Sequence, residues 1–159
     1  MSTTPKVLDL AALRDALDSR RRQGHTVAFA NGLFDLLHVG HLRYLEGAAE
    51  EGDLLVVAIN SDRSARELKG PSRPVVPEHE RAELVAGFGC VDHVTIFDES
   101  TVEPLLRELR PDVHCKGTDY TQETVPEAAV ANELGIRIAI VGDPKRHATR
   151  EMIQRLREE

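Results

Sequence analysis

The sequence has little cysteine, no long apolar run and no excess of basic charge. Cys90 and Cys115 show no C-x-x-C spacing, so we expect two reduced and buried thiols and no disulfide framework. No apolar segment approaches the ~20 residues that a membrane span needs. The net charge of -7 argues against a nucleic-acid-binding surface, because such surfaces are usually basic. A small anionic ligand is compatible with this charge if basic groups gather at one site.

Several common nucleotide and metal motifs are also absent. The sequence holds no G-x-x-x-x-G-K-[ST] phosphate loop. The stretch GFGCVD, residues 87–92, lacks the third glycine of a dinucleotide fingerprint and precedes a predicted strand instead of following one. No spacing of histidine and cysteine is typical of a zinc site. Residues 1–10 lack the basic start and apolar centre of a secretion signal, so we expect a cytoplasmic protein without a membrane segment.

What the sequence does contain is an alternation of short apolar segments with amphipathic ones. The predicted strands are 25–30, 54–60, 92–97, 112–116 and 137–141. The predicted helices are 8–24, 39–52, 77–88, 101–109, 126–135 and 148–159. The proline-rich stretch 68–77 predicts an ordered loop.

This alternation defines the expected fold class. The run LLVVAIN, residues 54–60, is apolar without a period of two, which is typical of a strand covered on both faces. Parallel neighbours need crossover helices, so we predict a Rossmann-like α/β fold: a doubly wound, parallel five-stranded sheet with helices on both faces. The length predicts one domain over residues 1–159, with an N-terminal helix in 1–24 and the core in 25–159.

The strongest functional signal is ANGLFDLLHVGHLRYLEGA, residues 30–48. It follows the first predicted strand, and ligands of a doubly wound sheet bind beyond the carboxyl ends of the strands, where the strand order reverses. Asn31 and Gly32 are predicted to form a tight turn, and Gly40 permits close approach of a ligand to the backbone. The amino end of the following helix suits a phosphate group.

Two histidines lie in the same stretch. His38 and His41 are three residues apart and can point at one chemical group. The alternative is that both are ordinary surface histidines brought together by chance. Their position around Gly40, at the expected ligand edge, favours a phosphate site.

These residues carry a resemblance to a known family. The pattern G-x-F-D-x-x-H-x-G-H resembles the signature of the cytidylyltransferase-like nucleotidyltransferases; its members here are Gly32, Phe34, Asp35, His38, Gly40 and His41. Residues 60–101 and the motif KGTDY, 116–120, resemble the adenylyltransferase domain of bacterial ADP-heptose synthases. The likeness extends from about residue 27 to the C-terminus. It implies transfer of AMP from ATP to a sugar 1-phosphate, D-glycero-D-manno-heptose 1-phosphate, and it implies a homodimer.

The chemistry of such a transfer explains an absence in the sequence. If the acceptor is itself a phosphate, the nucleophile is already ionised near pH 7, because its second pKa is about 6. No general base is needed, and catalysis consists of positioning and electrostatic stabilisation. His38 and His41 are expected to donate hydrogen bonds to triphosphate oxygens. The cofactor Mg²⁺ is expected to bind the triphosphate, with few protein ligands.

The resemblance also implies roles for individual residues. The expected catalytic residues are His38, His41 and Lys69. The expected nucleotide-binding residues are Leu33, Phe34, His38, Gly40, His41, Arg81, Asp119 and Thr149. The expected acceptor-binding residues are Asp35, Lys69, Arg73 and Lys116, and Asp35 is also a candidate for orienting the metal.

Each of these assignments has a structural alternative. Lys69 and Arg73 would otherwise belong to a solvated basic loop. Arg81 would otherwise pair with Glu78 or Glu83 on its own helix. The KGTDY motif would otherwise be a structural turn.

The C-terminal part departs from the family pattern. Where the family has a Ser-Thr-Thr segment that binds triphosphate, this sequence has Ala148, Thr149 and Arg150. Thr149 retains one hydroxyl, and Lys145, Arg146 and Arg150 add positive charge. Two other functions therefore stay open: a cytidylyltransferase that uses CTP and glycerol 3-phosphate, and a nucleotide-binding module without turnover.

Overall fold

The sheet at the centre of the protein is fully parallel. The computed structural model describes residues 4–144 and 148–159. The strands follow the order β3-β2-β1-β4-β5. They are β1 (Val27–Gly32), β2 (Leu54–Asn60), β3 (His93–Phe97), β4 (Val113–Lys116) and β5 (Arg137–Ile140). The predicted Rossmann-like α/β class is confirmed.

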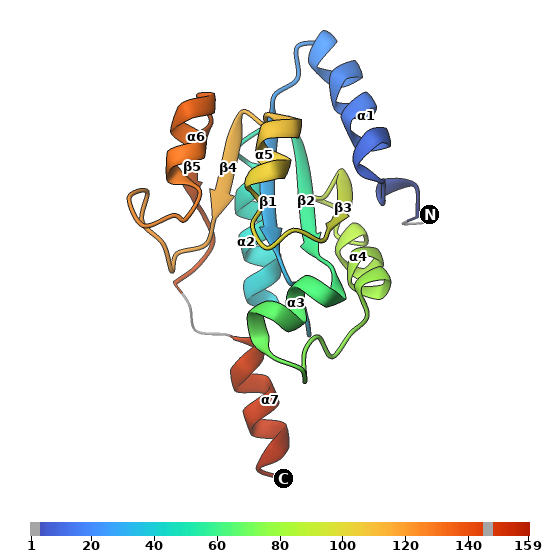
Figure 1. The fold of residues 1–159 in the computed structure, drawn as a ribbon, viewed down its shortest axis with the longest axis vertical. Coiled ribbons are helices and arrows are strands. Elements are labelled where there is room, and N and C mark those ends of the chain that lie inside the picture. Colours follow the sequence, from blue (N-terminus) through green and yellow to red (C-terminus); the bar gives the residue numbers. More distant parts are fainter. Residues whose placement is uncertain (1–3, 145–147) are drawn as a thin grey trace.

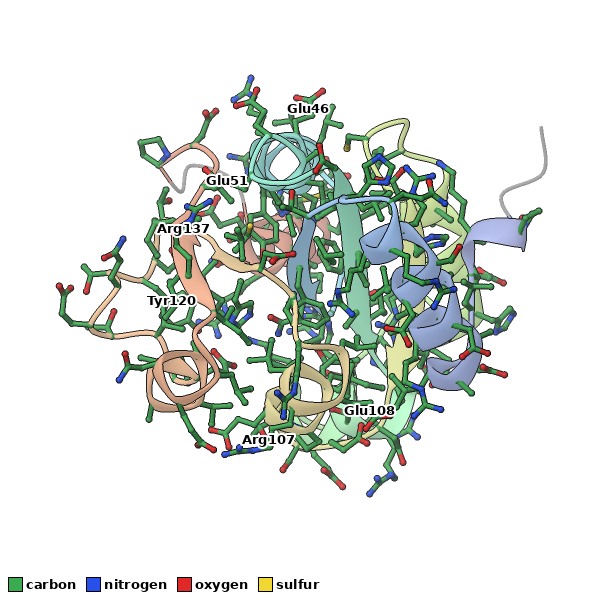
Figure 2. The ribbon with its side chains drawn as sticks, turned by 90° about the horizontal axis from the view of Figure 1, so that it is seen from above. Glu46, Glu51, Arg107, Glu108, Tyr120 and Arg137 are labelled. Carbon is green, nitrogen blue, oxygen red and sulfur yellow. The ribbon has the colours of Figure 1, made fainter. Side chains whose placement is uncertain are left out.

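Helices cover both faces of this sheet, as Figure 1 shows. They are α1 (Leu10–Arg22), α2 (Val39–Ala49), α3 (Asp62–Lys69), α4 (Glu78–Ala86), α5 (Glu103–Leu109), α6 (Ala128–Leu134) and α7 (Thr149–Arg157), preceded by a 3₁₀ turn, η1 (Thr4–Lys6). Helices α2 and α4 pack on one face, and α1, α5 and α6 pack on the other. Figure 2 shows α2, with Glu46, and the turn after it, with Glu51, opposite α5, with Arg107 and Glu108.

The core follows from the alternation of side chains along each strand. In β1, Val27 and Phe29 pack against the α1, α5 and α6 layer, while Ala28 and Ala30 pack against the α2 and α4 layer. All seven residues of β2 are buried, as its continuous apolar run predicts. Each face of the sheet therefore has its own hydrophobic cluster.

The strand order places a ligand edge between two particular strands. The chain adds β2 and β3 on one side of β1, and then places β4 and β5 on the other side. The order thus reverses between β1 and β4, which pair in parallel with Phe29 opposite His114. The crevice at the carboxyl ends of β1 and β4 is where such sheets bind ligands.

Three local expectations are corrected by the structure. Asn31 and Gly32 do not form a turn, because β1 continues through both and pairs them with β2. Helix α3 was not predicted, since it is short and its sequence, DRSARELK, is strongly polar. Cys115 is buried as expected, whereas Cys90 is only partly buried; both are free thiols.

Gly52 tests how tightly the turn between α2 and β2 is packed. A Cβ atom at this position would lie 2.8 Å from the backbone nitrogen of Ala28, which cannot move without shifting β1. We expect Gly52→Ala to lower the free energy of unfolding by about 1 to 3 kcal/mol. Gly89→Ala is the matched control, because a Cβ atom added there would meet nothing within 4 Å. Urea denaturation of both variants measures the difference, and equal stability would contradict the packing described.

Candidate active site

A cavity of about 910 Å³ opens at the carboxyl ends of β1 and β4. Its walls come from the segments that follow these strands, from α2 and from the start of α7. Every residue assigned to the site from the sequence lines this cavity, with the exception of Arg81: Leu33, Phe34, Asp35, His38, Gly40, His41, Lys69, Arg73, Lys116, Asp119 and Thr149. Residues far apart in the sequence thus meet where the fold predicts a ligand.

The two histidines are fixed by backbone hydrogen bonds at the start of α2. The N–H of Gly40 donates to Nδ1 of His38 at 3.1 Å, and the N–H of His38 donates to Nδ1 of His41 at 3.2 Å. The ring centroids lie 4.0 Å apart. Because each Nδ1 accepts a hydrogen bond, each neutral ring carries its proton on Nε2. The pair is therefore built to present two Nε2–H donors.

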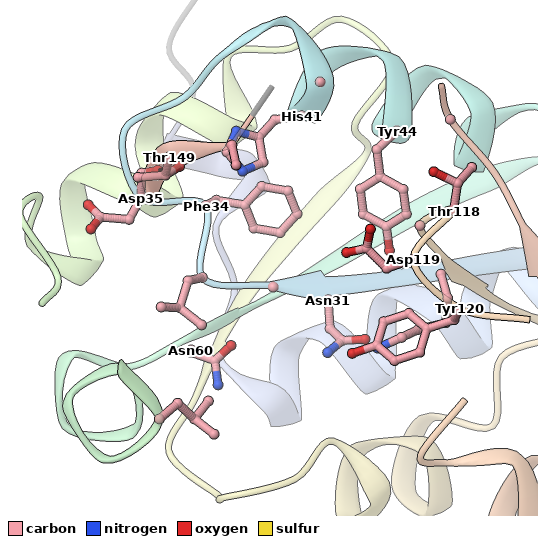
Figure 3. A pocket seen from close by; sticks show the side chains of 18 of the residues that line it. Asn31, Phe34, Asp35, His41, Tyr44, Asn60, Thr118, Asp119, Tyr120 and Thr149 are labelled. Atoms are coloured by element: carbon pink, nitrogen blue, oxygen red, sulfur yellow. Dashed lines mark hydrogen bonds between the residues drawn. The ribbon is translucent and has the colours of Figure 1, made fainter. Parts of the chain in front are cut away.

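The turn that leads to these histidines is unusual in its backbone. Phe34 and Leu36 adopt left-handed conformations, with φ of 52° and 45°. Non-glycine residues rarely do so, and such strain is retained where the surroundings determine it. The ring of Phe34 packs between those of His41 and Tyr44, at centroid distances of 5.4 and 6.4 Å, as Figure 3 shows. The turn thereby places Phe34 against the ring of His41 and fixes the orientation of that ring.

The side chain of Asp35 is held by hydrogen bonds from the protein itself. Its side chain is 1% exposed and accepts hydrogen bonds from Nε of Arg73 at 2.7 Å and from the N–H groups of Val75 and Val76 at 2.9 and 3.0 Å. Burial alone raises the pKa of Asp35, but these donors outweigh it and hold the pKa below its ordinary value. In Figure 3 the carboxylate points away from His41. Asp35 thus fastens the loop 70–77, and its contact with an acceptor or a metal stays a prediction.

Helix α7 is attached to the same turn. The hydroxyl of Thr149 donates to the backbone oxygen of Asp35 at 2.8 Å. No residue of α7 is buried, and Figure 1 shows the helix extending away from the sheet. The hydroxyl predicted to bind triphosphate is thus already a donor to the backbone. Of the basic residues expected nearby, Arg150 lines the cavity, while Lys145 and Arg146 lie outside the described residues.

Arg81 is corrected from a ligand contact to a structural residue. Its side chain is fully buried, and its guanidinium donates to the backbone oxygens of Val76 and Leu33 and to Oδ1 of Asp62. It pairs with neither carboxylate of its own helix that the sequence suggested. Arg81 therefore ties α4 to the loop before it, to the turn after β1 and to α3, and it does not reach the cavity.

Three basic residues form a second wall of the cavity. Lys69, Arg73 and Arg150 line both the main cavity and an adjoining one of about 320 Å³, which Arg157 also lines. Arg73 is paired with Asp35, but Lys69, Arg150 and Arg157 make no ion pair with any other described residue. In a chain of net charge -7, this concentration of cations suits an anionic group such as phosphate.

The wall that follows β4 combines charge with burial. Nζ of Lys116 lies 3.8 Å from Oε2 of Glu127 and 4.9 Å from the ring centroid of Tyr120. Burial lowers the pKa of Lys116, and the Glu127 carboxylate opposes that shift. Asp119 lies on the exposed side of the same segment and lines the cavity. Figure 3 shows Tyr120 on the opposite side of the cavity from His41.

Several lining residues were missed by sequence reasoning, among them Tyr44, Asn60 and Glu127. Tyr44 lies one helical turn after His41, so helical spacing could have indicated it; its hydroxyl donates to the backbone oxygen of Cys115 at 2.7 Å. Asn60 ends β2 and could have been found from its place at the carboxyl edge. Glu127 carries no signal in the local sequence, because only the fold brings it to Lys116.

The described residues show neither a metal cluster nor a membrane span. Within 4–144 and 148–159, no three histidine, cysteine, aspartate or glutamate side chains are placed to hold a metal ion. Over those ranges, no helix has both the length and the apolar character that crossing a bilayer requires.

Comparison with known proteins identifies the family. The chain belongs to the cytidylyltransferase-like family, whose model matches residues 29–153. It is 48% identical over 145 residues to the bifunctional protein HldE of Syntrophotalea carbinolica, and 43% identical over 151 residues to that of Methylobacillus flagellatus. These matches cover 91% and 95% of this chain but only 30% and 31% of the relatives, so the chain corresponds to about a third of their length.

Solved structures show the same fold. A lipopolysaccharide core biosynthesis protein of Thermoplasma volcanium superposes with a TM-score of 0.65 at 27% identity, covering 76% of this chain and 99% of that one. A pantoate-beta-alanine ligase of Francisella tularensis also gives 0.65, covering 90% of this chain and 68% of that one. At 16% identity, the second likeness concerns the fold alone.

The structural role of Asp35 leads to a stability prediction. Asp35→Asn removes the negative charge beside Arg73 and replaces one acceptor oxygen with an NH₂ group, which cannot accept a hydrogen bond. We therefore expect the free energy of unfolding to fall by about 3 kcal/mol or more. Amide exchange at Val75 and Val76 is expected to accelerate. The control is Glu108→Gln, which breaks the exposed 2.6 Å pair with Arg14 and should cost less than about 1 kcal/mol. Equal losses in the two variants would contradict the role of Asp35.

Proposed function

We propose that this chain is a nucleotidyltransferase that transfers AMP from ATP to the phosphate of a sugar 1-phosphate. The proposed acceptor is D-glycero-D-manno-heptose 1-phosphate. The observation that carries the proposal is the pair His38 and His41, whose Nδ1 atoms both accept backbone hydrogen bonds at the ligand edge of the sheet. The relatives named HldE support the heptose acceptor through the resemblance to ADP-heptose synthases, and a structural relative is named for lipopolysaccharide core biosynthesis.

The reaction balances without a general base. An oxygen of the acceptor phosphate attacks the α-phosphorus of ATP and forms a new P–O bond. The bond from the α-phosphorus to the oxygen that bridges to the β-phosphorus breaks, and pyrophosphate leaves with the electron pair. The acceptor needs no deprotonation by the protein, because a phosphate monoester is mostly ionised at pH 7. The products are ADP-heptose and pyrophosphate.

The protein then contributes position and charge. The Nε2–H groups of His38 and His41 donate to the oxygens of the α-phosphate as negative charge develops there. Lys69 and Arg150 attract the β- and γ-phosphates from the basic wall of the cavity. Fixed donors of this kind need no rearrangement during the reaction, which is the source of their catalytic effect.

Mg²⁺ fits this arrangement as a companion of the nucleotide. The carboxylate of Asp35 accepts hydrogen bonds from Arg73, Val75 and Val76. The described residues offer no cluster of three metal-binding side chains. The phosphates and water are therefore the proposed ligands, as Mg²⁺ prefers. When bound, Mg²⁺ neutralises part of the triphosphate charge.

Pyrophosphate release tests the proposed function directly. The protein is incubated with ATP or CTP, Mg²⁺ and either D-glycero-D-manno-heptose 1-phosphate or glycerol 3-phosphate. We expect release with ATP and the heptose phosphate. Release with CTP and glycerol 3-phosphate alone would instead identify the cytidylyltransferase. No release with any pair would leave a nucleotide-binding module and contradict the enzyme.

His41→Ala tests the contribution of one donor. We expect turnover to fall by at least about 10²-fold, since the loss of one preorganised donor costs this much in comparable sites. The loss of the His38 N–H contact should cost about 1 kcal/mol of stability, so the variant should remain folded by circular dichroism. His79→Ala, on an exposed histidine of α4, is the control. Near-normal turnover of His41→Ala would contradict the mechanism.

A further inference from the structure

The wall of the cavity after β4 contains a carboxylate oxygen that lacks a partner. Oε2 of Glu127 is buried and accepts no hydrogen bond from any described residue. Glu127 as a whole is 7% exposed, and it lines the main cavity together with Lys116 and Tyr120. Buried polar atoms are almost always hydrogen-bonded to protein, ligand or ordered water, so this oxygen has room for a partner from the cavity.

The neighbouring lysine does not supply the missing bond. Nζ of Lys116 lies 3.8 Å from Oε2 of Glu127, beyond hydrogen-bond distance. Exposed pairs of the same protein, Arg14 with Glu108 and Arg43 with Asp143, close to 2.6 Å. A pair whose side chains are only 10% and 9% exposed has more to gain from closing than these surface pairs do. The distance of 3.8 Å between Nζ of Lys116 and Oε2 of Glu127 is therefore long for a buried ion pair.

Helix α6 does not explain the position of the Glu127 side chain. It precedes α6, but its side chain makes no capping hydrogen bond to that helix. The backbone oxygen of Glu127 accepts from the N–H of Ala131, which any residue could provide. The carboxylate is thus held in the cavity wall without serving the helix.

The two groups together match one kind of partner. A lysine ammonium only donates hydrogen bonds, and a carboxylate only accepts them. An oxygen atom that lies about 2.8 Å from both Nζ of Lys116 and Oε2 of Glu127 can bridge these two atoms. This oxygen must accept a hydrogen bond from Nζ and donate one to Oε2. A hydroxyl does both, and so does the water molecule that a hydroxyl would displace. An ionised phosphate cannot donate, and an exocyclic amine of a nucleobase donates but does not accept.

We propose that Lys116 and Glu127 together bind one hydroxyl group of the acceptor, and that this contact selects a polyhydroxylated sugar phosphate over acceptors that lack the hydroxyl. The inference rests on the proposed function and adds a specificity-determining residue, Glu127, to it. The ring of Tyr120, beside Nζ of Lys116, offers an apolar surface next to the same hydroxyl. Sites built to bind a hydroxyl reject analogues without it strongly, since their own polar groups are then left unpaired.

The test pairs protein variants with monodeoxy substrates. The probes are ATP with D-glycero-D-manno-heptose 1-phosphate and its monodeoxy analogues, and the readout is kcat/KM for pyrophosphate release. We expect the wild-type protein to lose roughly 10²-fold or more with one analogue, the one that lacks the bound hydroxyl. Glu127→Gln and Lys116→Met should each lower kcat/KM for the natural acceptor and abolish most of that discrimination. In the double variant, kcat/KM for the natural acceptor should fall no further than it does in either single variant.

Controls separate this effect from general damage. Glu123→Gln changes an exposed carboxylate of the same segment and should keep both rate and discrimination. The affinity for α,β-methylene ATP, measured by calorimetry, should stay within about twofold in Glu127→Gln, because the contact belongs to the acceptor. If Glu127→Gln slowed the reaction equally with every analogue and kept the wild-type discrimination, the pair would be a structural one and the proposal would be wrong.

Binding of the acceptor can be tested even if the proposed function is wrong. If the wild-type protein released no pyrophosphate with any acceptor, the proposed function would fail, and calorimetric titration with the heptose phosphate would decide the inference by itself. Weaker binding to Glu127→Gln than to the wild-type protein and Glu123→Gln would support it. Equal binding to all three, or no binding to any, would overturn it.

Discussion

A single buried residue, Asp35, connects three parts of the chain that line the cavity. Asp35 lies in the turn after β1, and its side chain receives three donors from the loop 70–77 while its backbone oxygen receives the hydroxyl of Thr149. These partners are 38 to 41 and 114 residues away in the sequence. Without this carboxylate, the loop 70–77 would lose the three hydrogen bonds that hold it to the turn after β1.

The two sides of the cavity differ in the kind of group that they can bind. The turn after β1 presents ring N–H donors, and the loop and α7 add cations, so this side favours phosphate. The segment after β4 presents a donor and an acceptor side by side in Lys116 and Glu127, which favours a hydroxyl. A reaction that joins a nucleotide phosphate to a sugar phosphate needs both kinds of surface within one cavity.

Local sequence patterns predicted most helices and strands, but they did not predict the tertiary contacts of individual side chains. The run 54–60 has the same bounds as β2, because a strand buried on both faces leaves an unbroken apolar signal. The His38 and His41 pair was likewise legible, since both residues lie within one short motif. The turn at Asn31 and Gly32 was wrong: the left-handed conformations fall on Phe34 and Leu36, where strain is supported by tertiary contacts that no local rule describes.

The errors about individual charges share a physical cause. Arg81 was expected to reach phosphates, but its partners lie on three different segments and bury it completely. Asp35 was expected to contact a ligand; it lines the cavity, but its carboxylate also accepts three hydrogen bonds from the protein. A charged side chain in a motif looks the same in sequence whether it binds substrate or the chain itself, and only the fold decides. Glu127 is the converse case, an unremarkable glutamate that the fold brings into the cavity.

A crystal structure of the protein with α,β-methylene ATP and Mg²⁺ would show directly where the triphosphate binds. We expect the α-phosphate within hydrogen-bond distance of Nε2 of both His38 and His41, with the β- and γ-phosphates toward Lys69 and Arg150. A triphosphate bound outside this cavity, or an α-phosphate beyond the reach of both histidines, would contradict the proposed mechanism.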